Sequence, residues 1–500
     1  QTIVDAYFDN VPDMTNPTQL VSFGTSGHRG TSVDGTFTDL HVAAITQAIC
    51  DGRKQFGATG PIFVGQDTHA LSQPALVTVL EVLAGNGVTA MVDCDMAFVP
   101  TPSVSRAIIR YNEEHDDKAD GIIITPSHNP PDNGGIKYNT IIGGPADTVV
   151  TKWIEMRANE YLTAYCESED FKRISIDNIE PTAQVPYDYK GLYVEELGDV
   201  INMEAIKAAG PKVLVDTLGG SGASYWNAIK ERYGLDLTII HDDYDPTFSF
   251  MTYDHDGKVR MDCSSTYVMA SVINRIGDFD LAVGNDPDYD RYGIVVSSGL
   301  ISANTFLTLA ARYLFTTRGW KNKGVGKTVV CTTMIDKWAA DAETPVFEVP
   351  VGFKYFSQLL FDGAIGIGGE ESAGASFLKK DGTVWTTDKD GMIMALLSME
   401  IMAVMGKSAL KMADESLEEF GNPSFGRIDA PCKKEQKQIL KQMSAELITA
   451  TTVDGDPITN IRTTSLYNDM PIDGVRVETD KGWFVARPSG TEDLYKIYGE

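Results

Sequence analysis

A serine on a proline-bounded turn is the first residue whose setting indicates chemistry. Ser127 stands in the run TPSHNP (125–130), directly after the apolar stretch 121–124. A buried strand followed by such a turn would present the Ser127 hydroxyl, which could act as a nucleophile. The alternative is an ordinary Ser/Asn turn in which the hydroxyl bonds the nearby backbone. The neighbouring His128 could act as a base or orient a phosphate, and its role stays open.

Three alternating carboxylates are the second such feature. Asp286, Asp288 and Asp290 follow the apolar stretch 280–284, and Pro287 favours an extended backbone at Asp286. Alternate side chains of an extended segment share one face, so these carboxylates would repel one another unless a cation lay among them. Hard oxygen ligands of this kind suit Mg²⁺. The alternative is an acidic surface turn. The serine and the carboxylates together indicate phosphoryl transfer at a metal-bound phosphoserine.

Two further segments could bind phosphate. The loop 23–30 carries Arg29 among Gly, Ser and Thr residues, and the run RPSGTE spans 487–492. Small residues let backbone N–H groups approach an anion, and arginine clamps a phosphate with its fork of donors. The alternatives are a flexible N-terminal loop for the first segment and a hairpin turn for the second.

Lys137 and the run GGEESAG (368–374) complete the set of candidates. Lys137 follows a glycine pair and could neutralise phosphate or move a proton, although most lysines are solvated surface charges. Glu370 and Ser372 place acceptors beside a donor, which suits the recognition of vicinal sugar hydroxyls. The alternative for this run is a helix N-terminus, where the helix dipole favours acidic residues.

Buried strands are the elements expected to position these side chains. Short apolar, β-branched runs that end in Gly or polar residues recur at 61–67, 212–216, 279–286 and 364–370. Such runs are typical of strands buried on both faces, and helical stretches such as 72–83 and 305–315 lie between them. This alternation predicts parallel α/β domains, in which ligands gather at the carboxyl ends of the strands. The candidate residues fall at these ends.

The bulk composition argues against several classes of protein. Five hundred residues are too many for one core, so several domains are expected. Hydrophobic residues make up 43% and charged residues 22% of the chain, which is ordinary for a globular protein, and the net charge of −28 argues against a broad nucleic-acid or anionic-membrane surface. The six cysteines are scattered without a C-x-x-C pair. Because the chain also has no apolar run of about 18 residues and no leader pattern, we expect a cytoplasmic protein.

Breaks in the pattern predict domains at residues 1–185, 186–301, 302–420 and 421–500. In this order they carry the serine, the carboxylates, the GGEESAG run and the RPSGTE run. The last domain differs, since 474–477 and 482–487 have the pattern of hairpin strands. The chain stops at residue 500, just after a strand-like stretch, with no helix to cover the sheet. We therefore expect the natural C-terminus to be longer.

Taken together, these motifs resemble those of the α-D-phosphohexomutase superfamily, and within it the bacterial-type phosphoglucomutases. Their order is TSGHRG, TPSHNP, DPDYDR, GEESAG and RPSGTE, and five motifs in one order are far more specific than any single one. The run HDGKVRMD (255–262) also resembles the bacterial branch. The resemblance implies three similar mixed-sheet α/β domains plus a smaller C-terminal α+β domain around a central active-site cleft.

The resemblance also implies a role for each motif. The Mg²⁺ ligands would be the phosphorylated Ser127 with Asp286, Asp288 and Asp290. The catalytic residues would be Ser127, Lys137, His128, Arg29 and Arg291. Among these, Lys137 stands slightly ahead of His128 as the proton-transfer candidate, and the arginines would stabilise charge. The substrate-binding residues would be Thr25, Ser26, Lys354, Glu370, Ser372, Arg487, Ser489, Gly490 and Thr491.

The implied reaction is the reversible conversion of glucose 1-phosphate to glucose 6-phosphate. Phosphorylated Ser127 would donate to the free hydroxyl and give glucose 1,6-bisphosphate, which serves as intermediate and activator. This intermediate would turn over inside the cleft and return its other phosphate to Ser127. The implied partners are hexose phosphates, with no nucleic acid and no membrane, and the protein would be a monomer or a homodimer.

Three other functions compete with this one. A related mutase would act on mannose, glucosamine or N-acetylglucosamine phosphates, whereas the GEESAG and TSGHRG motifs favour glucose. A catalytically silent sugar-phosphate-binding protein would not need a nucleophile, so the retained Ser127 argues against it. A Mg²⁺ phosphatase would not need the separate sugar and phosphate loops that favour a mutase.

Overall fold

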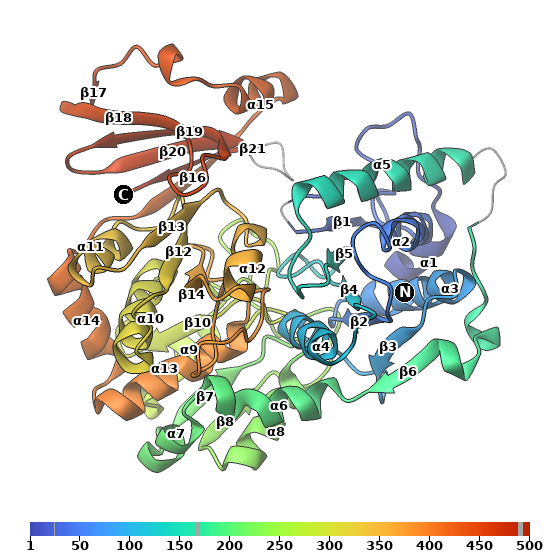
Figure 1. Cartoon of the computed structure of the whole chain (residues 1–500), viewed down its shortest axis with the longest axis horizontal. Coiled ribbons are helices and arrows are strands. Elements are labelled where there is room, and N and C mark those ends of the chain that lie inside the picture. Colours follow the sequence, from blue (N-terminus) through green and yellow to red (C-terminus); the bar gives the residue numbers. More distant parts are fainter. Residues whose placement is uncertain (25, 166–170, 489–493) are drawn as a thin grey trace.

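The computed structural model describes residues 1–24, 26–165, 171–488 and 494–500. Within these residues the strands form four sheets, which follow one another along the chain (Figure 1). The first three are mixed sheets flanked by helices, and the fourth is antiparallel. The predicted fold class, three mixed-sheet α/β domains and a C-terminal α+β domain, is confirmed.

The first sheet has the strand order β1-β5-β4-β2-β3-β6. Its strands are β1 (His28–Thr31), β2 (Ile62–Gln66), β3 (Ala90–Asp93), β4 (Asp120–Ile124), β5 (Asn133–Asn139) and β6 (Gln184–Tyr187). Its helices are α1 (Thr2–Asp9), α2 (Asp39–Gly52), α3 (Ser72–Gly85), α4 (Thr101–Glu114) and α5 (Thr148–Tyr165). Along β2, Ile62 and Val64 join the core beneath α2, α3 and α5, whereas Phe63 packs with α4. The strand is therefore buried on both faces, as its apolar run predicts.

The second sheet has the order β11-β10-β9-β7-β8, with β7 parallel to β8 and β9. Its strands are β7 (Val213–Asp216), β8 (Leu237–Ile240), β9 (Leu281–Gly284), β10 (Gly293–Val296) and β11 (Gly299–Leu300). Its helices are α6 (Tyr189–Val200), α7 (Met203–Ala209), α8 (Ala223–Tyr233) and α9 (Ala270–Ile273). The expected boundary between residues 185 and 186 falls inside β6, which pairs with β3 of the first sheet.

The third sheet has the order β13-β12-β14-β15, with β12 parallel to β13 and β14. Its strands are β12 (Gly324–Thr328), β13 (Val346–Val349), β14 (Ile365–Gly369) and β15 (Ala375–Phe377). Its helices are α10 (Ala303–Arg318), α11 (Met334–Asp341), α12 (Lys354–Phe361), α13 (Gly391–Met405) and α14 (Ala409–Phe420). Helix α13 packs against α7, so one apolar core continues from the second domain into the third.

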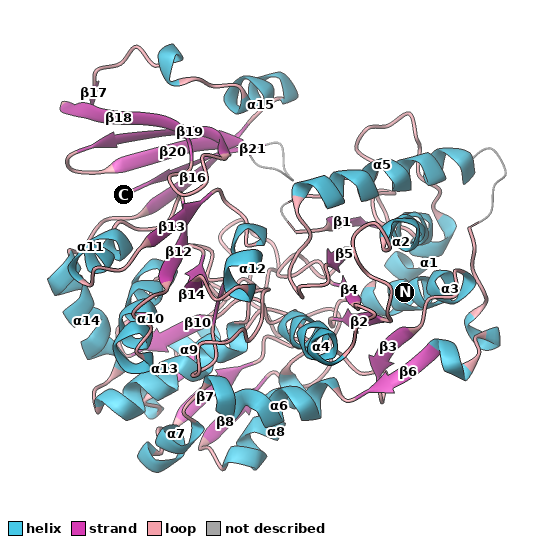
Figure 2. Ribbon diagram, viewed as in Figure 1, coloured by secondary structure: helices cyan, strands magenta, loops and turns pink. Residues whose placement is uncertain are grey.

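The fourth sheet is antiparallel, in the order β16-β21-β20-β19-β18-β17 (Figure 2). Its strands are β16 (Gly426–Pro431), β17 (Thr452–Val453), β18 (Asp456–Thr464), β19 (Pro471–Thr479), β20 (Trp483–Pro488) and β21 (Leu494–Gly499). The expectation that no helix covers this sheet is wrong, because α15 (Lys434–Lys441) packs against β19 and β20. This helix was missed because its charged sequence has few apolar residues to mark a buried face.

The helices predicted at 72–83 and 305–315 are confirmed as α3 and α10. Among the described residues, no single helix is both long and apolar enough to cross a membrane. Helices α13 and α14 meet the criteria of length and composition only as a pair bent by 87°.

Candidate active site

A cavity of about 1580 Å³ lies between the domains, at the loops that follow the central strands. Most of the predicted site residues line it: Ser26, Arg29, His128, Lys137, Asp290, Arg291, Lys354, Glu370, Ser372 and Arg487. Ser127, Asp286 and Asp288 are fully buried. Thr25, Ser489, Gly490 and Thr491 lie outside the described residues. Motifs far apart in the sequence therefore meet in one cleft.

The turn after β4 directs the Ser127 hydroxyl to the carboxylates. Ser127 has a φ of 60°, and its N–H donates to Thr125 Oγ1 at 2.8 Å. Its Oγ donates to Asp286 Oδ2 at 2.9 Å. A left-handed φ at a residue other than glycine costs about 1–2 kcal/mol, and such strain gathers at functional sites. Because the hydroxyl bonds Asp286 of another domain, the ordinary-turn interpretation of Ser127 is disfavoured.

The carboxylates of Asp286, Asp288 and Asp290, here called the aspartate triad, place one oxygen each within 4.8 Å of one another. The expectation that an extended backbone aligns them is wrong. The segment turns between β9 and β10, and Tyr289 has a φ of 63°. The turn instead wraps the side chains around a common centre, and Arg291 N–H donates to Asp286 Oδ1 at 2.9 Å.

In two members of the aspartate triad, one carboxylate oxygen is paired with lysine and the other has no hydrogen-bond partner among the described residues. Lys137 Nζ donates to Asp288 Oδ2 at 2.6 Å, and Lys389 Nζ lies 2.9 Å from Asp290 Oδ2. Asp288 Oδ1 and Asp290 Oδ1 are buried and accept no hydrogen bond from the described residues. Burial and the carboxylates of Asp288 and Asp290 raise the pKa of Asp286 well above its ordinary value. Buried, unbonded carboxylate oxygens around one centre fit a hard divalent cation.

Two lysines supply positive charge beside the aspartate triad. Lys137 lies on β5, and although burial lowers the pKa of Lys137, Asp288 and Asp290 outweigh it and hold that pKa above its ordinary value. Lys389 precedes α13 and was not predicted from the sequence, because a lysine in the run TTDKDG carries no signal without knowledge of its neighbours. Asp262 was missed for the same reason, and its Oδ2 lies 3.2 Å from Arg291 Nη1.

His128 and Arg29 flank the Ser127 turn. His128 Nδ1 lies 3.3 Å from Ser127 Oγ, and burial together with Arg291 lowers the pKa of His128 well below its ordinary value. This shift favours the neutral form of the imidazole. Arg29 Nη2 donates to Ser26 Oγ at 3.0 Å, so β1 brings a guanidinium to the same side of the cleft.

The predicted sugar-binding residues Glu370 and Ser372 lie on a loop of the third domain, next to Arg291, whose backbone pairs with Gly374. Glu370 follows β14 and leads through a turn to β15, so the helix N-terminus interpretation of this loop is wrong. Burial raises the pKa of Glu370 to about 7, although Lys389 opposes this shift. Lys354 begins α12, and its Nζ donates to Thr148 Oγ1 at 2.8 Å, across from the third domain to the first.

Comparison with known families agrees with this geometry. Models of the phosphoglucomutase/phosphomannomutase family match along the chain: α/β/α domain I at residues 20–164, domain II at 192–299 and domain III at 302–420. A phosphoglucomutase of Komagataeibacter xylinus is 48% identical over 503 residues, which cover 100% of this chain and 90% of that protein. The chain belongs to the phosphoglucomutase/phosphomannomutase family.

More distant relatives also align with nearly the whole of this chain. Phosphoglucomutase 1 of Saccharomyces cerevisiae is 26% identical over 98% of this chain and 89% of its own length. The crystal structure of a putative phosphomannomutase from Thermus thermophilus has a TM-score of 0.74, with 23% identity over 96% of this chain and 94% of that one. At that identity the structural likeness shows the fold alone.

Proposed function

We propose that this protein interconverts glucose 1-phosphate and glucose 6-phosphate through a phosphorylated Ser127 and glucose 1,6-bisphosphate. The observation that carries the proposal is the 2.9 Å contact between Ser127 Oγ and Asp286 Oδ2, next to residues such as His128 and Arg291 that line a cleft of about 1580 Å³. The relative from Komagataeibacter xylinus, 48% identical over the whole chain, is a phosphoglucomutase and supports glucose as the sugar.

The transfer step needs positioning and charge neutralisation more than covalent chemistry. A sugar hydroxyl oxygen attacks the phosphorus of phosphorylated Ser127, the bond between phosphorus and Ser127 Oγ breaks, and the hydroxyl proton passes to a base. The return step reverses these changes. Lys137 is the first candidate for proton transfer and His128 the second, since both line the cleft and His128 Nδ1 lies 3.3 Å from Ser127 Oγ. Because its pKa is raised by Asp288 and Asp290, Lys137 is suited to giving a proton to the leaving oxygen. The neutral form of His128 is suited to accepting a proton.

Four groups would hold the cofactor Mg²⁺: the aspartate triad and the phosphate on Ser127. When bound, Mg²⁺ would offset the negative charge of the transferring group. The Oδ1 atoms of Asp288 and Asp290, which accept no hydrogen bond from the described residues, are suitable ligands for this cation. Arg29 and Arg291 add fixed positive charge on the cleft walls.

The remaining residues would bind the substrate at its two ends. Glu370 and Ser372 would hold sugar hydroxyls, with Lys354 and Ser26 contributing at the cleft walls. Thr25, which lies outside the described residues, stays a predicted substrate-binding residue on its motif alone. Arg487, Ser489, Gly490 and Thr491 hold the phosphate that is not transferred. One clamp must accept either end of the sugar, and the cleft volume leaves room for a hexose bisphosphate to turn over.

The predicted partners are hexose phosphates alone. A fungal N-acetylphosphoglucosamine mutase of the same fold (TM-score 0.53, 16% identity, 97% of this chain and 92% of that one) was solved with GlcNAc-6P and magnesium. The monomer-or-homodimer and cytoplasmic assignments stay predictions. The described cysteines Cys50, Cys94, Cys263, Cys331 and Cys432 are unpaired, which is compatible with a reducing compartment.

A coupled assay tests this function. Glucose 1-phosphate is supplied with Mg²⁺ and a trace of glucose 1,6-bisphosphate, and glucose 6-phosphate and free phosphate are both measured. We expect turnover on glucose that is lost on chelation and that falls on the order of 10³-fold or more in Ser127→Ala, because the nucleophile is removed. The control Ser265→Ala removes a hydroxyl that donates to Asp254 in the cleft wall and should stay active.

Parallel reactions separate the alternatives. Faster turnover of mannose or glucosamine 1-phosphate than of glucose 1-phosphate would keep the mechanism and change the sugar. Phosphate release without isomerisation would favour a phosphatase. No turnover on any sugar phosphate would overturn the proposal in favour of a binding protein.

A further inference from the structure

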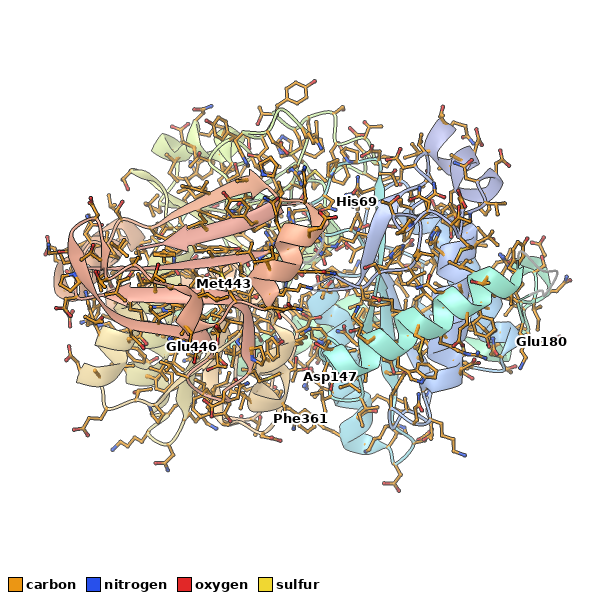
Figure 3. The ribbon with its side chains drawn as sticks, turned by 90° about the horizontal axis from the view of Figure 1, so that it is seen from above. His69, Asp147, Glu180, Phe361, Met443 and Glu446 are labelled. Carbon is orange, nitrogen blue, oxygen red and sulfur yellow. The ribbon has the colours of Figure 1, made fainter. Side chains whose placement is uncertain are left out.

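A buried aspartate–histidine pair lies beneath the Ser127 turn. Asp67 follows β2, and His69 comes two residues later; both side chains are fully buried. His69 Nδ1 lies 2.7 Å from Asp67 Oδ2, and His69 Nε2 lies 3.0 Å from the carbonyl oxygen of Asn129. Figure 3 labels His69 among the side chains. The proposed reaction assigns no role to this pair.

The pair holds the turn from both ends. On the N-terminal side, Thr125 Oγ1 donates to Asp67 Oδ2 at 2.6 Å and accepts the Ser127 N–H at 2.8 Å. On the C-terminal side, His69 bonds the carbonyl of Asn129. Ser72 Oγ donates to the other oxygen, Asp67 Oδ1, at 2.6 Å and fixes the carboxylate itself. The backbone around Ser127 is therefore held on one side by Asp67, through Thr125, and on the other by His69, and Asp67 and His69 contact each other.

The contacts of His69 define its charge. Each ring nitrogen faces an acceptor, a carboxylate oxygen at Nδ1 and a carbonyl oxygen at Nε2, so both nitrogens donate and the ring is an imidazolium ion. Burial lowers the pKa of His69, but Asp67 outweighs burial and raises it above its ordinary value. A neutral ring would leave one of the two acceptors without a donor, which is costly in a buried site.

The same histidine faces the domain that carries the aspartate triad. Its ring centre lies 5.0 Å from that of Phe248, a buried residue of the second domain. Nearby, Met261 N–H donates to the carbonyl of His128, so the second domain also bonds the turn directly. The pair thus lies between the nucleophile and the domain to which the nucleophile must be aligned.

We infer that His69, as an imidazolium ion paired with Asp67, is the positioning residue that holds Ser127 in line with the aspartate triad for phosphoryl transfer. This role rests on the proposed function and deepens it. His69 acts through the backbone of the turn and not on the sugar. A displacement of about 1 Å in a reacting group can cost on the order of 10²-fold in rate, because transfer depends on alignment.

The chain offers a matched control. His241 Nδ1 lies 2.8 Å from Asp216 Oδ1, at the ends of β8 and β7 in the second domain. The ring of His241 stacks on Phe250 at 4.4 Å, and among the described residues no hydrogen bond joins it to residues 125–130. His241→Gln therefore removes the same kind of pair without touching the turn.

The test compares His69→Gln and Asp67→Asn with His241→Gln in the full-length protein. Intact mass follows the phosphorylation of Ser127 by glucose 1,6-bisphosphate, and steady-state kinetics give kcat and KM for glucose 1-phosphate. We expect both the phosphorylation rate and kcat to fall about 10- to 100-fold in His69→Gln. KM should stay within about threefold, since the residues that contact the sugar are unchanged. His241→Gln should behave as the wild type.

Other outcomes would overturn the role. Wild-type kcat in His69→Gln, or a raised KM with kcat unchanged, contradicts positioning of the nucleophile. If the wild-type protein takes no phosphoryl group from the bisphosphate, the proposed function itself fails, and the two failures are thus distinct. Nitrogen-15 NMR of the wild type adds a readout independent of the variants' folding. Among its seven histidines, one ring should keep imidazolium shifts above pH 6.5, where an ordinary histidine loses its charge, and none doing so overturns the inference.

Discussion

Each carboxylate of the aspartate triad gives its two oxygens different partners. Asp286 takes Ser127 Oγ on one oxygen and the Arg291 N–H on the other. Asp288 takes Lys137 and Thr101 on Oδ2 and leaves Oδ1 unbonded. Bonds on one oxygen fix the direction of the other, so the cation site is shaped before a cation enters it. The lysines therefore serve the site even without touching the metal.

Removing one carboxylate charge should weaken cation binding. We expect Asp288→Asn to bind Mg²⁺ or Mn²⁺ at least about tenfold more weakly, since even the partners of metal ligands change affinity about 10- to 100-fold. Isothermal titration calorimetry measures this directly, without an activity assay. Asp254→Asn is the control, because Asp254 lines the same cleft but lies outside the aspartate triad. Equal affinity in both variants would contradict the site.

The residues that could be predicted from the sequence are those that lie in a short run of reactive side chains directly after an apolar strand. Ser127 and the aspartate triad stand in short runs after apolar strands, so local pattern was enough to find them. Lys389 and His69 act through tertiary contacts with Asp290 and Asn129, which no local pattern encodes. Their type and spacing are the same as those of ordinary surface or core residues.

At the scale of elements, prediction succeeded where one periodicity dominates. The apolar run at 61–67 became β2, buried on both faces between α4 and the other helices. Prediction failed at the DPDYDR segment, where the geometry of a turn, and not that of a strand, brings the aspartates together. Helix α15 was also missed, because its exposed, charged sequence has few apolar residues to mark a buried face.

Helix α2 gives the first domain a pH-dependent stability. His41 lies in this helix, accepts a hydrogen bond from Thr38 at Nδ1 and donates from Nε2 to the carbonyl of Gln19. Burial, with a smaller contribution from His28, lowers the pKa of His41 to about 3. The unfolded chain therefore binds a proton near pH 6.5 that the folded chain excludes, so stability is full above about pH 6.5 and falls as pH drops toward 3.

We expect His41→Gln to reduce this dependence. Between pH 6.5 and 5.5, the wild type should lose about 1 kcal/mol of unfolding free energy more than the variant, because glutamine does not titrate. Urea midpoints at pH 7.5, 6.5 and 5.5 measure the difference. His255→Gln is the control, since the His255 side chain is 64% exposed. Parallel pH profiles for wild type and His41→Gln would contradict the assignment.

At the scale of the whole molecule, the placement of the domains was beyond sequence reasoning because it depends on single buried contacts. The fourth domain docks on the third through an apolar cluster that includes Val329, Trp483 and Tyr498. Beside this cluster, Arg462 forms a bidentate ion pair with Glu348: its Nη1 donates to Oε1 at 2.5 Å and its Nη2 to Oε2 at 2.8 Å. These contacts hold the fourth sheet beside the third domain (Figure 1). Arg487, on β20 of this sheet, lines the cleft.

Breaking that ion pair should loosen the fourth domain. Arg462→Met leaves Glu348, whose side chain is 4% exposed, buried without its cation, and such a loss costs about 3–5 kcal/mol. We expect faster proteolysis in the connection at 421–425 and a raised KM for glucose 1-phosphate, because Arg487 moves with this domain. Phosphorylation of Ser127 in the first domain should change less.

A second substitution separates the ion pair from simple packing. The double variant Glu348→Met, Arg462→Met also removes the unpaired buried carboxylate. Its fourth domain should resist proteolysis nearly as well as that of the wild type, since replacing a buried ion pair by apolar side chains is often neutral or stabilising. Lys481→Met is the control, because Lys481 pairs with Asp456 at the surface, where such pairs contribute about 0–1 kcal/mol. If single and double variants are cleaved equally fast, the docking depends on the shape of Arg462 and not on its charge.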